Sequence, residues 1–279
     1  MDIRQRTLGQ EHPDTLASIG TLALTYQSQG RWEEAEKLGV KVMNIRQRTL
    51  GHEHPNTLTS MGNMALIYHS QGRCEEAEKL ETEVMDISQR TLGHEHPDTL
   101  AIMGNLASTY QSQERWEEAK KLEIKVMDIR QRTLGQEHPD TLASMGNLAA
   151  TYYIQGQWEE AEKLGVKVMN IMQRTIGHEH PDTLTSMENL ASTYQSQGRW
   201  EEAEKLGVKV IDIRQRTLGQ EHPDTLTSMA NLALTWNWQG RHADAKHLMA
   251  SCVQLRANIL GPEHPDTRES IEALDAWSL

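Results

Sequence analysis

Histidines two residues apart come closest to a metal-binding pattern in this sequence. The tripeptide His-Glu-His occurs three times, at His52/His54, His94/His96 and His178/His180. Two imidazoles can ligate zinc, but a structural zinc site takes four ligands, and no cysteine or third histidine lies nearby in the sequence. Copies in neighbouring stacked units would lie about 10 Å apart, which is too far to share one ion. We therefore predict no metal site, and expect these histidines to pack in loops or to cap helices before proline.

The cysteines and the recurring glutamate pairs do not form a catalytic pattern either. Cys74 and Cys252 are far apart in the sequence, and nothing suggests the base and oxyanion-binding group that a nucleophilic cysteine needs. Glu33 and Glu34, like their equivalents, are consecutive residues that open a helix, so they point apart and compensate the helix dipole. No glycine-rich phosphate loop is present. The sequence predicts a protein that is not an enzyme and that holds no cofactor.

These residues recur because the whole chain is a repeat. Glu-His-Pro returns every 42 residues from Glu11 to Glu263, and residues 9–50 and 135–176 are identical at 34 of 42 positions. In such an array each unit packs on its neighbours and the core is a continuous seam. We predict a single solenoid over residues 1–279. It consists of a partial helix at 1–8, six repeats at 9–50, 51–92, 93–134, 135–176, 177–218 and 219–260, and a capping helix at 261–279.

Each repeat contains two helical patterns separated by a turn. In residues 51–92 the first pattern places apolar side chains at steps of three and four, at Leu58, Met61, Ala65 and Tyr68. Pro55 suits the first turn of that helix, and Gly72 can adopt the left-handed conformation that ends it. Stacked hairpins bury their apolar sides, so the sequence predicts an all-α, right-handed superhelix of antiparallel helix pairs. It should contain 13 helices besides the N-terminal partial one, which marks the chain as a C-terminal piece of a longer protein.

Charge and hydropathy limit the partners. The net charge is -12, whereas nucleic acids and anionic membranes attract proteins through lysine and arginine. The chain has no run of about 18 apolar residues and begins without a signal peptide. Two cysteines without metal-ligand spacing are typical of a reducing compartment. We expect a cytoplasmic protein that binds neither nucleic acid nor membrane; its oligomeric state is not indicated.

The variants of NLALTYQSQGRWEEAEKL resemble the tetratricopeptide repeat (TPR). The large, small, aromatic and turn residues of that family fall at Leu148, Ala149, Tyr152, Gly156, Trp158 and Ala161. The period of 42, with LGxEHPDT between units, is similar to the kinesin-light-chain type, which also occurs at the C-terminal end of fungal and bacterial NLR-like receptors. The resemblance covers the whole chain and implies the TPR solenoid fold.

One position departs from the family pattern. A bulky apolar residue usually stands four residues after the signature alanine, and in this chain only Met249, in the last full repeat, matches it. The other repeats have Gly39, Glu81, Glu123, Gly165 and Gly207 there. We expect these small or acidic residues to alter the local curvature of the superhelix.

The resemblance also implies ligand-binding residues. An asparagine before the signature leucine can hydrogen-bond a ligand in TPR domains, and it maps onto Asn63, Asn105, Asn147, Asn189 and Asn231. An arginine of the preceding second helix helps to grip acidic peptides in the kinesin-light-chain type, and it maps onto Arg4, Arg46, Arg130 and Arg214. The alternative is structural, because the asparagines could bridge hairpins and the arginines could neutralise helix C-termini.

Differences between the repeats point to one part of the groove. Most first helices end in polar residues, but Tyr153, Ile154 and Trp238 place apolar surface there. Exposed apolar surface is unfavourable unless a partner covers it. We therefore predict a binding patch between repeats 4 and 6; packing against neighbouring loops is the alternative.

Together these features predict a non-catalytic module that binds a protein or peptide in its groove. We expect it to be the C-terminal ligand-sensing module of an NLR-type receptor. The alternative is a kinesin-light-chain-like cargo adaptor that binds acidic or Trp-containing peptides.

Overall fold

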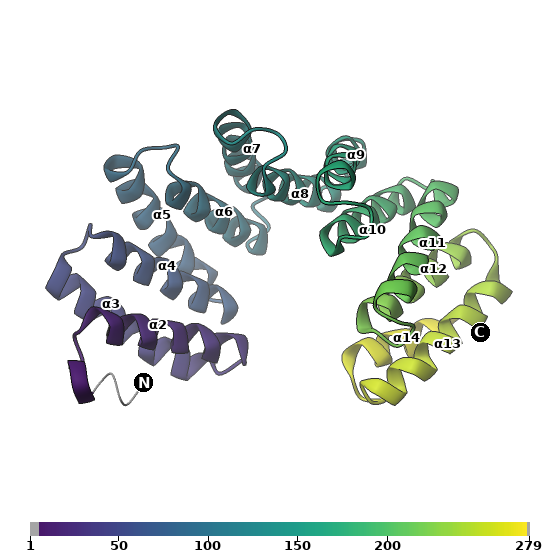
Figure 1. Ribbon diagram of the computed structural model, residues 1–279, viewed down its shortest axis with the longest axis horizontal. Coiled ribbons are helices and arrows are strands. Elements are labelled where there is room, and N and C mark those ends of the chain that lie inside the picture. Colours follow the sequence, from purple (N-terminus) through teal and green to yellow (C-terminus); the bar gives the residue numbers. More distant parts are fainter. Residues whose placement is uncertain (1–5, 278–279) are drawn as a thin grey trace. The chain divides into compact units, whose positions relative to one another are not determined.

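The computed structural model describes residues 6–277, and within this range it contains helices and no strands (Figure 1). The predicted all-α fold of antiparallel helix pairs is confirmed. Residues 6–8 are helical, whereas the rest of the predicted partial helix and the last two residues of the cap lie outside the described range. The helices are α2 (Pro13–Ser28), α3 (Trp32–Leu50), α4 (Pro55–Ser70), α5 (Cys74–Thr91), α6 (Pro97–Ser112), α7 (Trp116–Thr133), α8 (Pro139–Ile154), α9 (Trp158–Thr175), α10 (Pro181–Ser196), α11 (Trp200–Thr217), α12 (Pro223–Trp238), α13 (His242–Ile259) and α14 (Pro265–Ala276).

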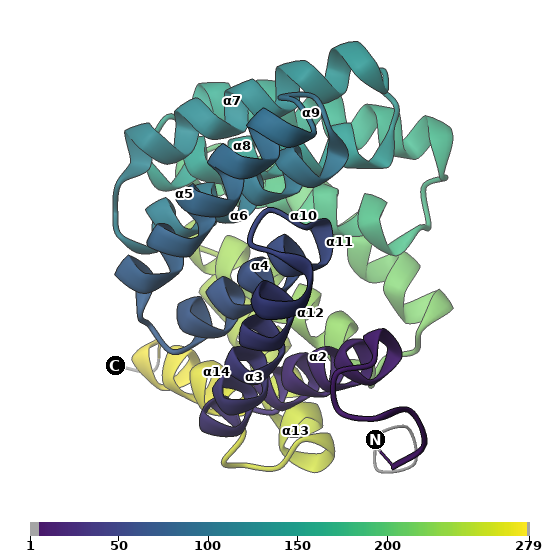
Figure 2. The same cartoon turned by 90° about the vertical axis from the view of Figure 1, so that its left-hand side faces the viewer.

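The helices form two compact units, residues 1–136 with α2–α7 and residues 137–279 with α8–α14. In the first unit α3 packs against both α2 and α4, which the two views show from different sides (Figures 1 and 2). The first helices α2, α4 and α6 also contact one another in order and form one layer. In the second unit each helix from α8 to α13 packs against the next. That all 279 residues form one continuous solenoid stays a prediction.

Histidine and proline begin every first helix of a pair. His54 is the N-cap of α4, where its Nδ1 accepts a hydrogen bond from the Asn56 amide at 3.1 Å, and Pro55 follows in the first turn. The same cap begins α2, α6, α8, α10, α12 and α14. The second histidine of each His-Glu-His therefore satisfies a backbone amide. Among residues 6–277, no three histidine, cysteine, aspartate or glutamate side chains are grouped as metal ligands.

The turn between paired helices requires a left-handed residue. Glycine occupies this position with φ between 72° and 80° in five turns, but Glu114 takes it with φ 60° in the turn before α7. A left-handed residue with a Cβ costs about 1 kcal/mol.

We expect Glu114→Gly to raise the free energy of unfolding, measured in urea, by about 1 kcal/mol. Gly72→Glu is the matched reverse change and should lower it, since no atom crowds that Cβ position; equal stability of both variants would contradict this account.

Apolar side chains pack between the two helices of each pair and also between neighbouring pairs. Within one pair, Met61 of α4 packs with Val84 and Ile87 of α5. Between pairs, Ala23 and Ala35 of α2 and α3 pack with side chains of α4. The seam is therefore continuous within the unit, as expected for a repeat array.

A polar clamp joins neighbouring pairs at the turns. Glu36 of α3 accepts hydrogen bonds at 2.9 Å from both Gln71 and Arg73, and the Arg73 guanidinium lies 4.1 Å from the centre of the Tyr68 ring. Hydrogen bonds from Gln71 and Arg73 hold the pKa of Glu36 below its ordinary value. The same set recurs as Glu78/Gln113/Arg115, Glu162/Gln197/Arg199 and Glu204/Gln239/Arg241.

Candidate functional site: a pocket between α8, α9 and α10

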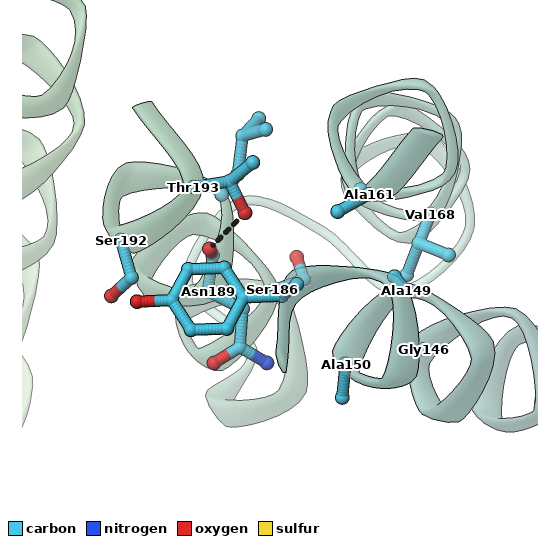
Figure 3. A pocket seen from close by; sticks show the side chains of 12 residues that line it. Gly146, Ala149, Ala150, Ala161, Val168, Ser186, Asn189, Ser192 and Thr193 are labelled. Atoms are coloured by element: carbon cyan, nitrogen blue, oxygen red, sulfur yellow. Dashed lines mark hydrogen bonds between the residues drawn. The ribbon is translucent and has the colours of Figure 1, made fainter. Parts of the chain in front are cut away.

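A pocket of about 270 Å³ opens in the second unit between the first helices α8 and α10 and the second helix α9 (Figure 3). None of the residues that line it is charged. Two glycines and three alanines account for its size, because they leave space where larger side chains would project. The lining residues are Gly146, Ala149, Ala150, Tyr153, Ala161, Gly165, Val168, Ser186, Asn189, Leu190, Ser192 and Thr193.

The equivalent positions of other repeats show why the pocket is open here. Gly165 corresponds to Glu81 in α5 and to Met249 in α13, which are larger and are both buried. Gly39 in α3 is also a glycine, but a Cβ there would lie only 2.8 Å from the Met64 sulfur. Met64 therefore fills that hole from the next helix. At Gly165 the nearest side chain is Leu190, whose Cδ1 would lie 3.3 Å from a Cβ, and the space beside it stays open.

A second difference lies in the first helix. Gly146 corresponds to Glu188 in α10, and Glu188 lines the equivalent hollow beside Gly207. Gln195 lines the same hollow and donates a hydrogen bond to Thr235 at 2.6 Å, so only about 20 Å³ remain. An open pocket needs small residues on both helices, and α8 and α9 supply them together.

Two polar groups at the pocket have no partner among the described residues, the amide of Asn189 and the hydroxyl of Ser192. The other polar side chains are engaged: the Thr193 hydroxyl donates to the Asn189 carbonyl at 3.0 Å, and the Tyr153 hydroxyl accepts from Ser196 at 3.1 Å. The pocket can therefore take an apolar group and hydrogen-bond a neighbouring polar one. Its lining contains neither a nucleophilic cysteine nor a titratable acid or base suited to catalysis.

The predicted asparagines occupy equivalent places but not one site. Asn189 lines the pocket, and Asn231 lines the small hollow beside Gly207. Asn63 and Asn105 line a separate hollow of about 160 Å³ between α4 and α6 in the first unit. Asn147 is exposed on α8 and is not part of the pocket lining.

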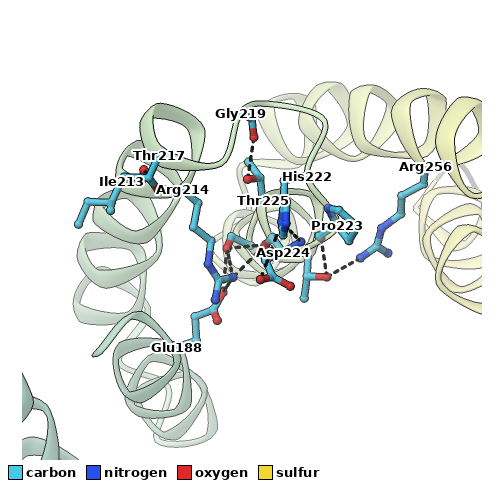
Figure 4. Close-up of polar contacts among 12 residues, drawn as sticks. Glu188, Ile213, Arg214, Thr217, Gly219, His222, Pro223, Asp224, Thr225 and Arg256 are labelled. Atoms are coloured by element: carbon cyan, nitrogen blue, oxygen red, sulfur yellow. Dashed lines mark hydrogen bonds and ion pairs between the residues drawn. The ribbon is translucent and has the colours of Figure 1, made fainter. Parts of the chain in front are cut away.

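Two of the predicted arginines, Arg46 and Arg214, each join a second helix to the start of the next first helix. Arg214, which is 6% exposed, donates to the Asp224 carbonyl at 2.9 Å, and to Ser228 and Glu188 at 2.7 Å (Figure 4). Arg46 donates in the same way to the Asn56 carbonyl and the Ser60 hydroxyl of α4. Arg256 donates to the Asp266 carbonyl and the Ser270 hydroxyl of α14. Arg130 has the same position near the end of α7, and Arg4 lies outside the described residues. In these contacts the guanidinium supports the first turn of a helix.

The three apolar residues that break the polar pattern separate in the structure. Tyr153 lies at the pocket, but Ile154 and Trp238 do not line it. Trp238, the last residue of α12, stacks on Trp200 with ring centres 5.8 Å apart and the planes 7° from parallel. Gly146 and Ser192 were not predicted as site residues. The only signal in the sequence was the glycine at position 165, which was interpreted as an effect on curvature.

Comparison with known proteins agrees with this fold. Family models described as tetratricopeptide repeat match residues 18–90, 82–132, 99–173, 140–216, 187–236 and 225–266. The chain belongs to the tetratricopeptide repeat family. A search of curated proteins gives no match.

Solved structures of TPR proteins are similar over most of the chain. A putative kinesin light chain with nearly identical TPR-like repeats from Podosopora anserina is 39% identical, with a TM-score of 0.66, over 74% of this chain and 98% of that one. BtubC (BKLC) from P. vanneervenii is 22% identical, with a TM-score of 0.71, over 84% and 94%. A STAND protein with a tetratricopeptide repeat sensor from Pyrococcus horikoshii is 16% identical, with a TM-score of 0.70, over 94% of this chain and 38% of that one.

These matches confirm the predicted kinesin-light-chain-like TPR array. The chain is a TPR protein-interaction scaffold, a kind of fold that is typically non-catalytic. No helix among the described residues is long and apolar enough to cross a membrane.

Proposed function

We propose that this TPR array is a non-catalytic domain that binds a protein or peptide, and that the pocket between α8, α9 and α10 anchors one side chain of the ligand. The observation that carries the proposal is the opening of this pocket by Gly146 and Gly165 together, whereas α10 has Glu188 in place of Gly146, and α5 and α13 have Glu81 and Met249 in place of Gly165. The Asn189 amide lies at the same pocket and can hydrogen-bond the ligand backbone.

The lining indicates what the anchor must be. A volume of about 270 Å³ holds one large side chain rather than a whole drug-sized molecule. A carboxylate or ammonium group would lose its hydration there without meeting an opposite charge, which is unfavourable. The anchor is therefore an uncharged, apolar side chain, and flanking peptide groups bond to Asn189 and Ser192.

The proposed parent is a cytoplasmic NLR-type receptor in which this array is the C-terminal ligand-sensing module. The similarity to a STAND protein with a TPR sensor supports this role. A kinesin-light-chain-like cargo adaptor is the second candidate, supported by the 39% identity to a putative kinesin light chain. A nucleotide-binding loop upstream in the parent chain would favour the receptor, and coiled-coil heptads the adaptor.

The pocket is tested by filling it with side chains that other repeats already carry. A peptide selected from a random library on the wild-type protein should bind Gly165→Met and Gly146→Glu at least about tenfold more weakly, because its anchor is displaced. Calorimetric titration measures the affinity. A Cβ at position 165 would lie 3.3 Å from the Leu190 Cδ1, so the Leu190 side chain must shift slightly. Met is a better helix former than Gly by about 1 kcal/mol, which offsets this shift, so Gly165→Met should keep its melting temperature.

The matched control is Gly62→Glu, the change equivalent to Gly146→Glu in α4 of the first unit. It should leave the affinity within about twofold of wild type. If both pocket variants bind the peptide as the wild-type protein does, the pocket is not the anchor site and the proposal is wrong.

A further inference from the structure

A second surface of the second unit exposes large apolar side chains at the turns between helices. Trp238 is 67% exposed, Ile154 55% and Trp158 39%, and Trp200 stacks under Trp238. We call these four residues the aromatic edge. None of them lines the pocket between α8, α9 and α10. Exposed apolar surface of this kind marks an interaction site on a soluble protein.

Two shallow hollows lie along the aromatic edge. One surrounds Trp158 and measures about 650 Å³, and the other surrounds Trp200 and measures about 620 Å³. Arg199 lines both hollows, so they are neighbours on one continuous surface.

Negative charge dominates this surface. Six glutamates line the two hollows, Glu159, Glu160, Glu162, Glu201, Glu202 and Glu204. The only cations in the lining, Arg199 and Arg241, are already engaged: Arg199 pairs with Glu162 and Glu202, and Arg241 with Glu204 and Asp244.

Two of the six glutamates remain available. Glu160 is bound by Lys163, which also attracts Glu159, but Glu159 and Glu201 form no hydrogen bond or ion pair with any described residue. Each directly follows a tryptophan of the aromatic edge. Exposed carboxylates beside indole rings are complementary to a cation, because the ring face and the carboxylate both attract positive charge.

We propose that the aromatic edge is a second docking surface, and that it binds a basic peptide segment of a partner protein. Arginine or lysine side chains of the segment lie over the Trp238 and Trp158 rings and pair with Glu201 and Glu159. The protein itself uses this geometry, since the Arg199 guanidinium lies 4.3 Å from the centre of the Tyr194 ring.

The probe for this proposal is a fluorescein-labelled, capped tetra-arginine peptide, and its binding is followed by fluorescence anisotropy at low salt. Trp238→Ser installs the residue found at 28, 70, 112 and 196, so it preserves the fold. We expect this change to weaken binding about fivefold. The double variant Glu159→Gln/Glu201→Gln should weaken it about tenfold. Gly165→Met fills only the pocket and should leave tetra-arginine binding unchanged.

The matched control removes the same charge elsewhere. Glu75 and Asp86 on α5 are exposed, and Glu75 follows Cys74, which stands where α11 has Trp200. Glu75→Gln/Asp86→Asn should leave binding within about twofold of wild type. Equal weakening by both double variants would show that tetra-arginine responds only to net charge. That result would overturn the proposal, and so would unchanged tetra-arginine binding in Trp238→Ser. The proposal would also be wrong if the wild-type protein is a dimer that Trp238→Ser dissociates, because a second copy would then cover the aromatic edge.

Discussion

Replacing Arg214 by methionine is expected to lower the free energy of unfolding by about 3–5 kcal/mol. The guanidinium is buried and donates to the Glu188 carboxylate, the Asp224 carbonyl and the Ser228 hydroxyl. Methionine occupies the equivalent position 172 in α9, so it fits the helix, but it leaves the partly buried carboxylate of Glu188 without its cation. Urea denaturation followed by circular dichroism measures the loss.

Two controls separate the buried pair from charge in general. The double variant Arg214→Met/Glu188→Gly installs the residues that the preceding repeat has at these positions, Met172 and Gly146. It should recover part of the lost stability because no unpaired carboxylate remains. Arg216→Met breaks the exposed pair with Glu179 and should cost less than about 1 kcal/mol. If the buried and exposed changes cost the same, Arg214 does not hold α12 to α11 as described.

Replacing Glu81 by methionine should make the protein more stable above pH 7 and have little effect near pH 4. Glu81 is only 2% exposed, its Oε2 has no hydrogen-bond partner among the described residues, and burial raises its pKa to about 7. In the unfolded chain the same group has its ordinary pKa of 4.5. Between these values the folded protein binds a proton that the unfolded chain has lost, so wild-type stability falls as the pH rises from 4.5 to 7.

The rise of the Glu81 pKa from 4.5 to about 7 corresponds to about 3 kcal/mol of lost stability above pH 7. Glu81→Met, which installs the residue found at 249, removes that penalty. The gain should therefore grow from pH 4.5 to pH 7 and then remain constant, as measured by urea denaturation at several pH values. Glu75→Gln, an exposed control in α5, should show no such slope. If the difference in stability between Glu81→Met and the wild-type protein does not change with pH, burial does not raise the pKa of Glu81 as described.

Most of the fold could be predicted because each of its signals is local. The period of 42, Pro55 at a helix start and Gly72 at a helix end act over a few residues, and the structure has helices where these signals place them. The clamp was not predicted. Glu36 and Arg73 are 37 residues apart in different helices, and their contact depends on how two hairpins stack.

The candidate site was harder to predict for the same reason. Gly39 and Gly165 have the same identity and position, yet Met64 fills one space while Leu190 leaves the other open. Which residue a neighbouring helix contributes cannot be read from the glycine itself. Trp238 shows a related limit: helical periodicity placed it on the groove, but as the last residue of α12 it stacks on Trp200 at the turn.

The central claim is that the pocket between α8, α9 and α10 receives the ligand, and methyl NMR tests it most directly. In protein labelled at alanine and valine methyl groups, a library-selected peptide should shift the signals of Ala149, Ala150 and Val168, which line the pocket. The equivalent methyl groups of Ala65 and Val84 in the first unit are buried and should not shift. Peptide binding that leaves the three pocket methyl signals unchanged would contradict the account.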